Sequence, residues 1–147
     1  MTTSQDYLVA IGLAAKESGI RKIQYPVFQA FAYYLRTQKR VFTDYLFNGA
    51  ALPPPRDQQE PIEFPQSVEL AEDLNLLVSY GFYREVAGSV AYEITSRAEA
   101  RRERYIGRWE SGAQQAFSEL RELAAQQLSL PEELLRRSYQ QYIRELG

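Results

Sequence analysis

The sequence predicts a single, mainly α-helical domain that contains one small β-hairpin. Residues 67–95 read as an amphipathic helix followed by two short β-prone runs. Most other apolar residues recur every three or four positions, which is the spacing of one helix face. A length of 147 residues with 45% hydrophobic residues suits one core of ordinary size.

Two helices are expected near the N-terminus. Residues 6–16 carry apolar side chains at helical spacing, and Gly19 is a suitable stop. A second helix is expected to begin at Tyr25 and Pro26, because proline fits the first helical turn, and to continue through Leu35.

The next segment is harder to assign from its pattern. Residues 41–47 either continue the second helix after a break or form a short helix that ends near Asn48 and Gly49. Residues 51–65 are rich in proline and polar residues, a composition that excludes a helix. They are expected to form an extended, solvated loop.

The segment 67–95 carries the clearest signals. Ser67 is a suitable cap for a helix, and Gly81 suits the left-handed position after its last turn. Residues 82–87 and 90–95 then predict a hairpin with a two-residue turn at Gly88 and Ser89. The apolar face of this helix consists of Leu70, Leu74, Leu77 and Val78.

Two helices are expected at the C-terminus. From Ser96 the apolar spacing predicts one long helix, bent or broken at Gly107 or Gly112. A last helix should begin at Pro131 and lie antiparallel to the long helix that precedes it. Residues 97–147 are thus expected to be a helical pair, either within the same compact unit or as a dimerisation extension.

Composition removes most catalytic designs. The chain has no cysteine and no histidine, which excludes thiolate nucleophiles, Ser-His-Asp triads and the commonest transition-metal ligands. Glu72 and Asp73, like Glu132 and Glu133, are adjacent and diverge on a helix, so they cannot face one site. No glycine-rich phosphate loop is present. We expect no enzyme, no cofactor, no metal site and no small-molecule substrate.

The sequence also suggests a location. Residues 1–6 are polar and lack the pattern of a secretory signal, and charged residues interrupt every later apolar stretch. We therefore expect no membrane association and a cytoplasmic protein.

Residues 70–82 form a leucine-rich run that ends in Gly81-Phe82, and residues 92–95 read Tyr-Glu-Ile-Thr. With the order of three helices, a hairpin and a further helix, these runs resemble the winged-helix domain. The resemblance covers about residues 5–100, and residues 1–96 would then form a winged-helix-like domain interrupted by the insertion at 51–65. The basic turn at Arg21 and Lys22, followed by an aromatic-rich helix, resembles the same region of small uncharacterised bacterial winged-helix proteins. The insertion departs from the family, as does Thr95-Ser-Arg-Ala where the family has a later glycine. The sequence segments on which the resemblance rests are Leu70-Ala-Glu-Asp-Leu74-Asn-Leu-Leu77-Val-Ser-Tyr-Gly81-Phe82 and Tyr92-Glu-Ile94-Thr95.

The winged-helix resemblance implies that the third helix would read DNA, but its charge argues against this. It carries Glu69, Glu72 and Asp73, with no Lys or Arg between Gln66 and Tyr83. Residues 51–96 as a whole hold two Lys/Arg against eight Asp/Glu. Carboxylates near phosphate oppose the counterion release that drives DNA binding, so this helix is expected to face protein or solvent.

A row of arginines offers a second surface. Four of them follow a spacing of four, three and four, which would place them on one helix face, with a fifth beside them. They either grip nucleic acid or an acidic partner, or pair along the helix with Glu99, Glu103 and Glu110. The five nucleic-acid-binding candidates are Arg97, Arg101, Arg102, Arg104 and Arg108.

Aromatic residues supply the third surface. They make up 13% of the chain, with eleven tyrosines, and several cluster on the two C-terminal helices. Aromatic residues are enriched at interface centres, although tyrosines at a core margin are also common. The protein-interface candidates are Trp109, Phe117, Tyr139 and Tyr142, together with Glu69, Glu72 and Asp73 of the third helix.

These observations favour a non-catalytic protein-interaction or adaptor module that self-associates, acting as a small regulator in a bacterial cytoplasm. The alternative is a DNA-binding transcriptional regulator that uses the arginine row and the wing. A phage or defence-system component is a third possibility. The identity of the partner lies beyond what the residues specify.

Overall fold

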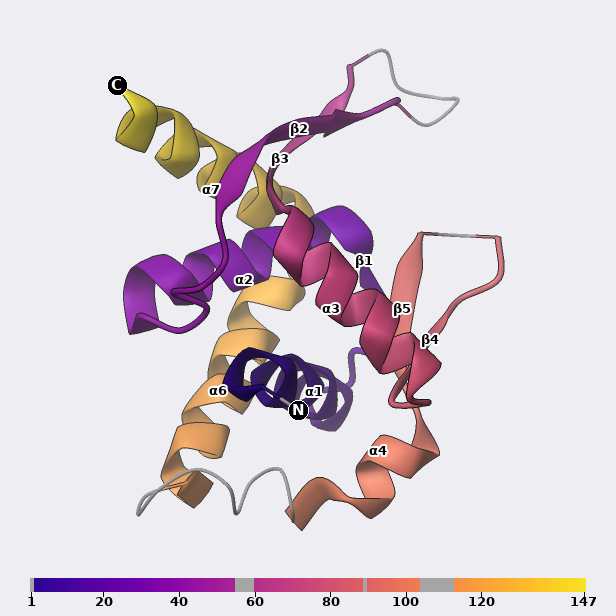
Figure 1. Ribbon diagram of the computed structural model, residues 1–147. Helices are drawn as coiled ribbons and strands as arrows, with labels where there is room; N and C mark the ends of the chain where they lie inside the picture. Colours follow the sequence, from indigo (N-terminus) through magenta and orange to yellow (C-terminus); the bar gives the residue numbers. More distant parts are fainter. Residues whose placement is uncertain (1, 55–59, 89, 104–112) are drawn as a thin grey trace.

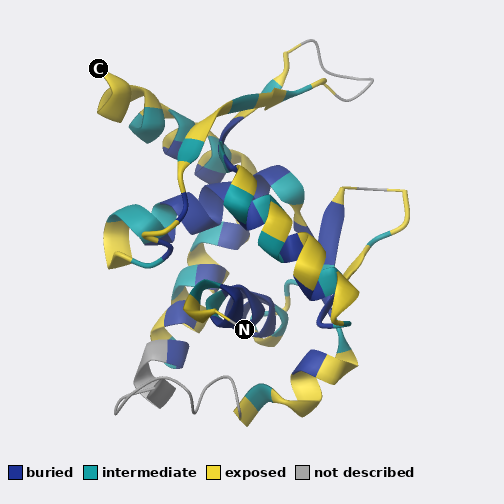
Figure 2. Cartoon of the chain, in the orientation of Figure 1, coloured by how far each residue is buried: buried dark blue, intermediate teal, exposed yellow. Residues whose placement is uncertain are grey.

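Helix α1 (Thr3–Glu17) lies among the other helices of the computed structural model, which describes residues 2–54, 60–88, 90–103 and 113–147 (Figure 1). Every residue from Leu8 to Ala15 is buried, so this helix is apolar on all sides (Figure 2). Thr2 and Gln5 form a reciprocal capping box at its start. Gly19, at φ +86°, follows its end, as the sequence predicts.

Helix α2 (Tyr25–Lys39) follows the short strand β1 (Ile23–Gln24). Its start at Tyr25 with Pro26 in the first turn confirms the sequence prediction. The helix ends at Arg40, whose left-handed φ of 57° turns the chain away.

The segment after α2 differs from the sequence prediction. Residues 41–47 form no helix, and Phe42 has a positive φ of 58°. Strands β2 (Phe47–Leu52) and β3 (Ile62–Ser67) then pair antiparallel in a separate two-stranded sheet. Residues 51–52 and 62–65, at the two ends of the expected loop, are therefore strand residues. Proline was misleading here, because a two-stranded sheet has only edge strands, where Pro65 is tolerated.

Helix α3 (Val68–Ser79) begins directly after β3. The Ser67 hydroxyl accepts a hydrogen bond from the Leu70 amide at 3.2 Å, which confirms the predicted cap. Gly81, at φ +82°, occupies the predicted left-handed position after the helix.

The predicted hairpin is present as strands β4 (Tyr83–Glu85) and β5 (Ala91–Ile94). Residues 86–90 connect them, so the connection is longer than the two-residue turn expected from Gly88 and Ser89. Strand β5 also pairs with β1, which gives an antiparallel sheet in the order β1-β5-β4. The chain is thus mainly helical, with two small antiparallel sheets.

The C-terminal part begins with a short helix rather than a long one. Helix α4 (Ser96–Ala100) ends at Arg101, and α6 (Ala113–Leu128) and α7 (Pro131–Leu146) follow. The expected bend sites, Gly107 and Gly112, lie outside the described residues. Helix α6 packs on α1, and α7 packs on α2 and β3. Within the described part of the chain, no helix has both the length and the apolarity to cross a membrane.

Candidate functional site

Helix α3 has a buried face and an exposed face of different character. Leu70, Leu74 and Leu77 are fully buried against the core. On the opposite side, Val68, Leu76 and Tyr80 are 57%, 42% and 45% exposed. Large apolar groups therefore occur on both sides of this helix, and only one side is covered.

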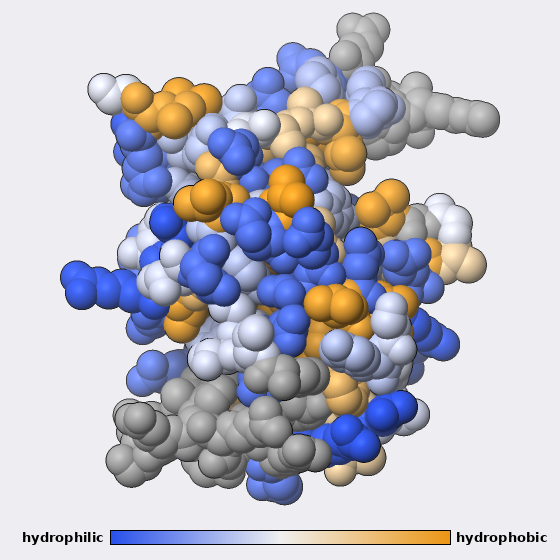
Figure 3. Space-filling view, in the orientation of Figure 1, coloured by the Kyte–Doolittle hydropathy of each residue, from blue (hydrophilic) through white to orange (hydrophobic). Residues whose placement is uncertain are grey.

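The exposed apolar residues of α3 form one stripe. Val68, Glu72, Leu76 and Tyr80 are spaced by four, so they follow one side of the helix. Leu46 is 68% exposed and its amide donates to Glu69 of the first turn at 3.0 Å, which places it beside this stripe. Figure 3 shows hydrophobic atoms over α3, separated by hydrophilic ones. We call these residues the α3 surface: Leu46, Val68, Glu72, Leu76 and Tyr80.

Two of the three acidic interface candidates of α3 have internal partners. Asp73 accepts hydrogen bonds from Tyr45 Oη at 2.5 Å and from Gln5 Nε2 at 2.8 Å. Glu69 accepts from the Leu46 amide. These carboxylates fix α1 and the segment after α2 to α3, and Glu72 is exposed.

The Tyr45–Asp73 contact is strengthened by burial. Tyr45 is 1% exposed, and burial, followed by its hydrogen bond to Asp73, raises the pKa of the phenol far above its usual value. The hydroxyl therefore stays protonated and donates to the carboxylate. This interaction holds Leu46, the next residue, beside α3.

The arginine row divides into two environments. Arg97 and Arg101 are exposed, and their guanidinium carbons lie 5.4 and 5.6 Å from the centroid of the Phe82 ring. Neither forms an ion pair within the described residues. The single helix face expected for the row is interrupted where α4 ends, and Arg104 and Arg108 lie outside the described part of the chain.

Arg102 has a different role from its two neighbours. It pairs with Glu17 at 3.2 Å and with Glu103 at 3.0 Å, and its guanidinium carbon lies 4.9 Å from the centroid of Phe117. These contacts tie the segment after α4 to α1 and α6. The pair with Glu103 is one of those expected along the row, whereas Glu99 pairs with Lys16 of α1 at 3.0 Å and Glu110 lies outside the described residues.

The C-terminal aromatic candidates are mostly internal. Phe117 is 2% exposed and belongs to the core, and Trp109 lies outside the described residues. Tyr139 and Tyr142 are half-buried with centroids 6.2 Å apart, and both border Gly49 of β2. Their rings thus support the inserted hairpin. Ile143 and Leu146 of α7 are the exposed apolar groups at this end, at 47% and 67%.

Sequence reasoning missed the apolar members of the α3 surface. The spacing of Val68, Leu76 and Tyr80 was a usable signal, because they fall outside the leucine face of the helix. Leu46 had no such signal, since its position depends on contacts with residues distant in sequence.

The described residues contain no cluster of three or more acidic side chains that could hold a metal ion. Comparison with protein-family models, with curated proteins and with solved structures finds no match.

Proposed function

We propose that this protein is a non-catalytic, cytoplasmic interaction module built on a winged-helix-like fold, and that a protein partner docks on the α3 surface. The observation that carries the proposal is the exposed stripe of α3, which combines large apolar groups with a carboxylate and has no cation. Several large apolar side chains exposed on one side of a helix are typical of protein interfaces.

The element order supports the winged-helix part of the proposal. A helix, a strand, two further helices and a hairpin follow one another, and the sheet order β1-β5-β4 places the first strand beside the second strand of the hairpin. The hairpin β2–β3 is inserted between α2 and α3, where a helix-turn-helix has a short turn.

The charge of α3 separates this proposal from DNA reading. In a helix-turn-helix, the second helix enters the major groove with Arg, Lys, Asn or Gln aimed at base edges. Here the outward stripe presents valine, glutamate, leucine and tyrosine, flanked by Asn75 and Ser79. Desolvating Glu72 against phosphates would oppose binding.

DNA binding is the second candidate function because of Arg97 and Arg101. Both guanidinium groups are exposed, lie over the same ring and lack an ion-pair partner among the described residues. An anion beside them would relieve their mutual repulsion. The wing adds little, because its Arg84 is already paired with Glu93 at 2.8 Å.

Self-association would use the exposed end of α7. Ile143 and Leu146 are exposed beside the half-buried rings of Tyr139 and Tyr142. Two copies meeting there would cover these apolar groups.

Fluorescence anisotropy with random duplex DNA at low salt distinguishes the two candidate functions. We expect no salt-dependent binding at protein concentrations up to about 10 µM, where even non-specific DNA binders respond at low salt. Binding that is lost on Arg97→Ala and Arg101→Ala substitution would instead establish the DNA-binding alternative.

Sedimentation velocity tests self-association. We expect the sedimentation coefficient to rise over a range of about 1 to 100 µM, and Leu146→Glu to abolish this rise. Leu130→Glu is the matched control, because Leu130 is 58% exposed but lies at the opposite end of α7. A wild-type protein that stays monomeric throughout would remove self-association from the proposal.

A further inference from the structure

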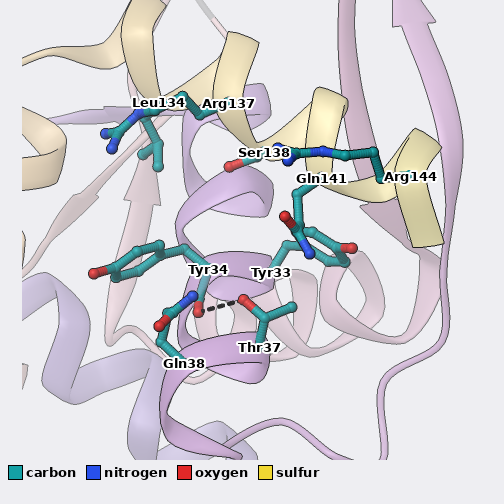
Figure 4. Close-up of a pocket in the computed structure, with 9 residues that line it drawn as sticks. All are labelled: Tyr33, Tyr34, Thr37, Gln38, Leu134, Arg137, Ser138, Gln141 and Arg144. Atoms are coloured by element: carbon teal, nitrogen blue, oxygen red, sulfur yellow. Dashed lines mark hydrogen bonds between the residues drawn. The ribbon is translucent and has the colours of Figure 1, made fainter.

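A pocket of about 220 Å³ lies between α2 and α7, away from the α3 surface (Figure 4). Helix α2 forms one wall of the pocket and helix α7 forms the other. On each helix the lining residues recur every three or four positions, so they lie on one helix face. The lining residues are Tyr33, Tyr34, Thr37 and Gln38 of α2, and Leu134, Arg137, Ser138, Gln141 and Arg144 of α7.

The apolar part of the lining is rigid. Leu134 and Tyr33 are 1% and 2% exposed, and the Tyr34 ring stacks on Phe31 with centroids 6.3 Å apart. Because Leu134 and Tyr33 are almost entirely covered, the partly exposed Tyr34 ring is the group of these three that a small molecule can reach. All three are fixed by the same packing that joins α7 to α2.

Several polar groups around the pocket already have partners. The Thr37 hydroxyl donates to the Tyr34 carbonyl at 3.0 Å, and the Ser138 hydroxyl donates to the Ala30 carbonyl at 3.3 Å. The Tyr33 hydroxyl donates to Glu145. None of these three hydroxyl protons is available to a ligand without breaking an existing bond.

The remaining donors are two guanidinium groups, the Tyr34 hydroxyl and the Gln38 amide. Arg137 uses one Nη atom on the neutral Gln127 side chain at 2.7 Å, and Arg144 makes only a 3.4 Å contact from Nε to the Gln140 carbonyl. Neither arginine forms an ion pair in the part of the chain that the structure describes. The Tyr34 hydroxyl has no hydrogen-bond partner among those residues.

The charge of the lining is one-sided. Two guanidinium groups and no carboxylate border the pocket. Glu145, which is not part of the lining, accepts from the Tyr33 hydroxyl and from the Gln141 amide at 3.2 Å. Arginine matches the planar, two-oxygen geometry of a carboxylate and retains its charge at all physiological pH values.

We infer that this pocket binds a small carboxylic acid with a single apolar ring. The carboxylate would accept from Arg144, whose guanidinium lies beside Ser138 and Gln141 (Figure 4), and the ring would lie against Tyr34. Arg137 points away from Arg144 and donates to Gln127 instead. A cavity of about 150 Å³ accommodates benzene, so a pocket of about 220 Å³ has room for one ring and a carboxylate. This inference is independent of the proposed partner surface on α3.

Benzoate is the probe, and benzamide is its uncharged counterpart of the same shape. We expect benzoate to bind the full-length protein with a Kd of about 1 mM and to shift the NMR signals of Tyr34, Leu134 and Gln141. Benzamide should bind at least about fivefold more weakly, because it cannot form a charge-assisted bond to either guanidinium.

Variants on α7 test the role of the arginines. Arg144→Gln should weaken benzoate binding by roughly fivefold, and Arg137→Gln should weaken it less, because the Arg137 guanidinium already donates to Gln127. Arg136→Gln is the matched control, since Arg136 lies on the same helix outside the pocket and pairs with Glu133 at 2.5 Å. All three variants change exposed side chains and should leave the melting temperature without ligand unchanged.

Three results would overturn the inference. The first is the absence of benzoate-induced shifts at about 10 mM ligand. The second is equal binding of benzoate and benzamide, or an equal loss in Arg136→Gln. The third is binding of inorganic phosphate as tightly as benzoate, which would show that the ring contributes nothing.

Discussion

Both small hairpins hold a fully buried ring, Tyr83 in β4 and Phe64 in β3, but the polar contacts that attach them to the helices differ. Tyr83 of β4 is 1% exposed, and its hydroxyl donates to the Leu8 carbonyl of α1. In β3, the backbone of Ser67 exchanges two hydrogen bonds with the buried side chain of Gln29, at 2.9 and 3.0 Å.

This difference explains why the two hairpins have different consequences for the fold. Strand β5 pairs with β1, so the β4–β5 hairpin is part of the three-stranded sheet that closes the core. The β2–β3 hairpin lies against α2 and α7 and extends beyond the helices (Figure 1). Apolar burial is roughly proportional to area, whereas the Gln29 contact depends on one side chain. The two attachments should therefore respond to different substitutions.

The largest effect is expected at Tyr83. Tyr83→Ala should lower the free energy of unfolding by about 4 kcal/mol, because it removes a fully buried ring and leaves a cavity beside α1. Urea denaturation measures this loss. Tyr80→Ala is the control, since Tyr80 is 45% exposed and should lose less than about 1 kcal/mol. Equal losses in the two variants would contradict the packing described here.

Alkaline pH should weaken the β4–β5 attachment and the core around it. Burial raises the pKa of Tyr83 and of Tyr92, whereas β2 and β3 carry no tyrosine. Burial, followed by repulsion from Glu119, raises the pKa of Tyr7 to about 12. A raised folded pKa means that stability present below the unfolded value near pH 10 is lost as the pH rises.

Tyr7 alone would account for at most about 3 kcal/mol of this alkaline loss, since its pKa rises by about two units. The free energy of unfolding, measured by urea denaturation at a series of pH values from neutral to pH 11, should decrease between pH 9 and pH 11. Tyr83→Phe should flatten the fall, and Tyr80→Phe should not. A flat profile in the wild-type protein would contradict the buried state of these phenols.

Gln29 is expected to matter less than Tyr83, and mainly for the other hairpin. Gln29→Leu keeps the volume but leaves the Ser67 amide and carbonyl without their partner, which should cost about 2 kcal/mol. Hydrogen exchange should increase at β3 and at the start of α3 more than at β4. The exposed Gln38→Leu is the control, and unchanged exchange at β3 would refute the proposed attachment.

Gly49 tests the contact between β2 and α7. A Cβ at this position would lie 3.3 Å from Cε1 of Tyr142, so Gly49→Ala should displace the tyrosine ring or the strand. We expect a loss of about 1 kcal/mol and altered NMR signals for Tyr139 and Tyr142. Gly88→Ala would be a poor control, because Gly88 has a positive φ. Ala50→Ser in the same strand is better matched, and an equal effect there would contradict the contact.

The smallest effect is expected at the exposed pair of the β4–β5 hairpin. A hydrogen bond from Arg84 lowers the pKa of Glu93, but both groups face solvent and Arg84 is 67% exposed. Arg84→Ala should therefore change stability by no more than about 0.5 kcal/mol. Urea denaturation at low and high salt measures it. A loss comparable to that of Gln29→Leu would place this pair among the principal attachments.

Helices α1, α2, α3 and α7 and the β4–β5 hairpin could be predicted from the sequence because their signals are local, whereas the end of α4 at Ala100 could not. Ser67, Gly81 and the alternation around Tyr92 specify the structure of neighbouring residues. The β2–β3 hairpin could not be predicted in this way. Its prolines argue for a loop, and its stabilising partners, Gln29 and Tyr142, are distant in sequence.

The candidate site shows the same division. The absence of cations on α3 was evident from the sequence and directed attention to its outer face. The internal bonds of Asp73 were not evident, because its partners Gln5 and Tyr45 come from other segments. Nor could the sequence show that Phe117 is buried, since helical spacing does not say which neighbour covers a face.

Site-specific photo-cross-linking in cells tests the docking proposal most directly, because the adduct reveals whether protein or nucleic acid touches α3. A photoreactive residue replacing Leu76 should give a protein adduct that is removed by protease and resists nuclease. The same residue replacing the exposed Glu132 of α7 is the control and should give no such adduct. A nuclease-sensitive adduct at position 76, or equal yields at both positions, would contradict a protein-binding role for the α3 surface.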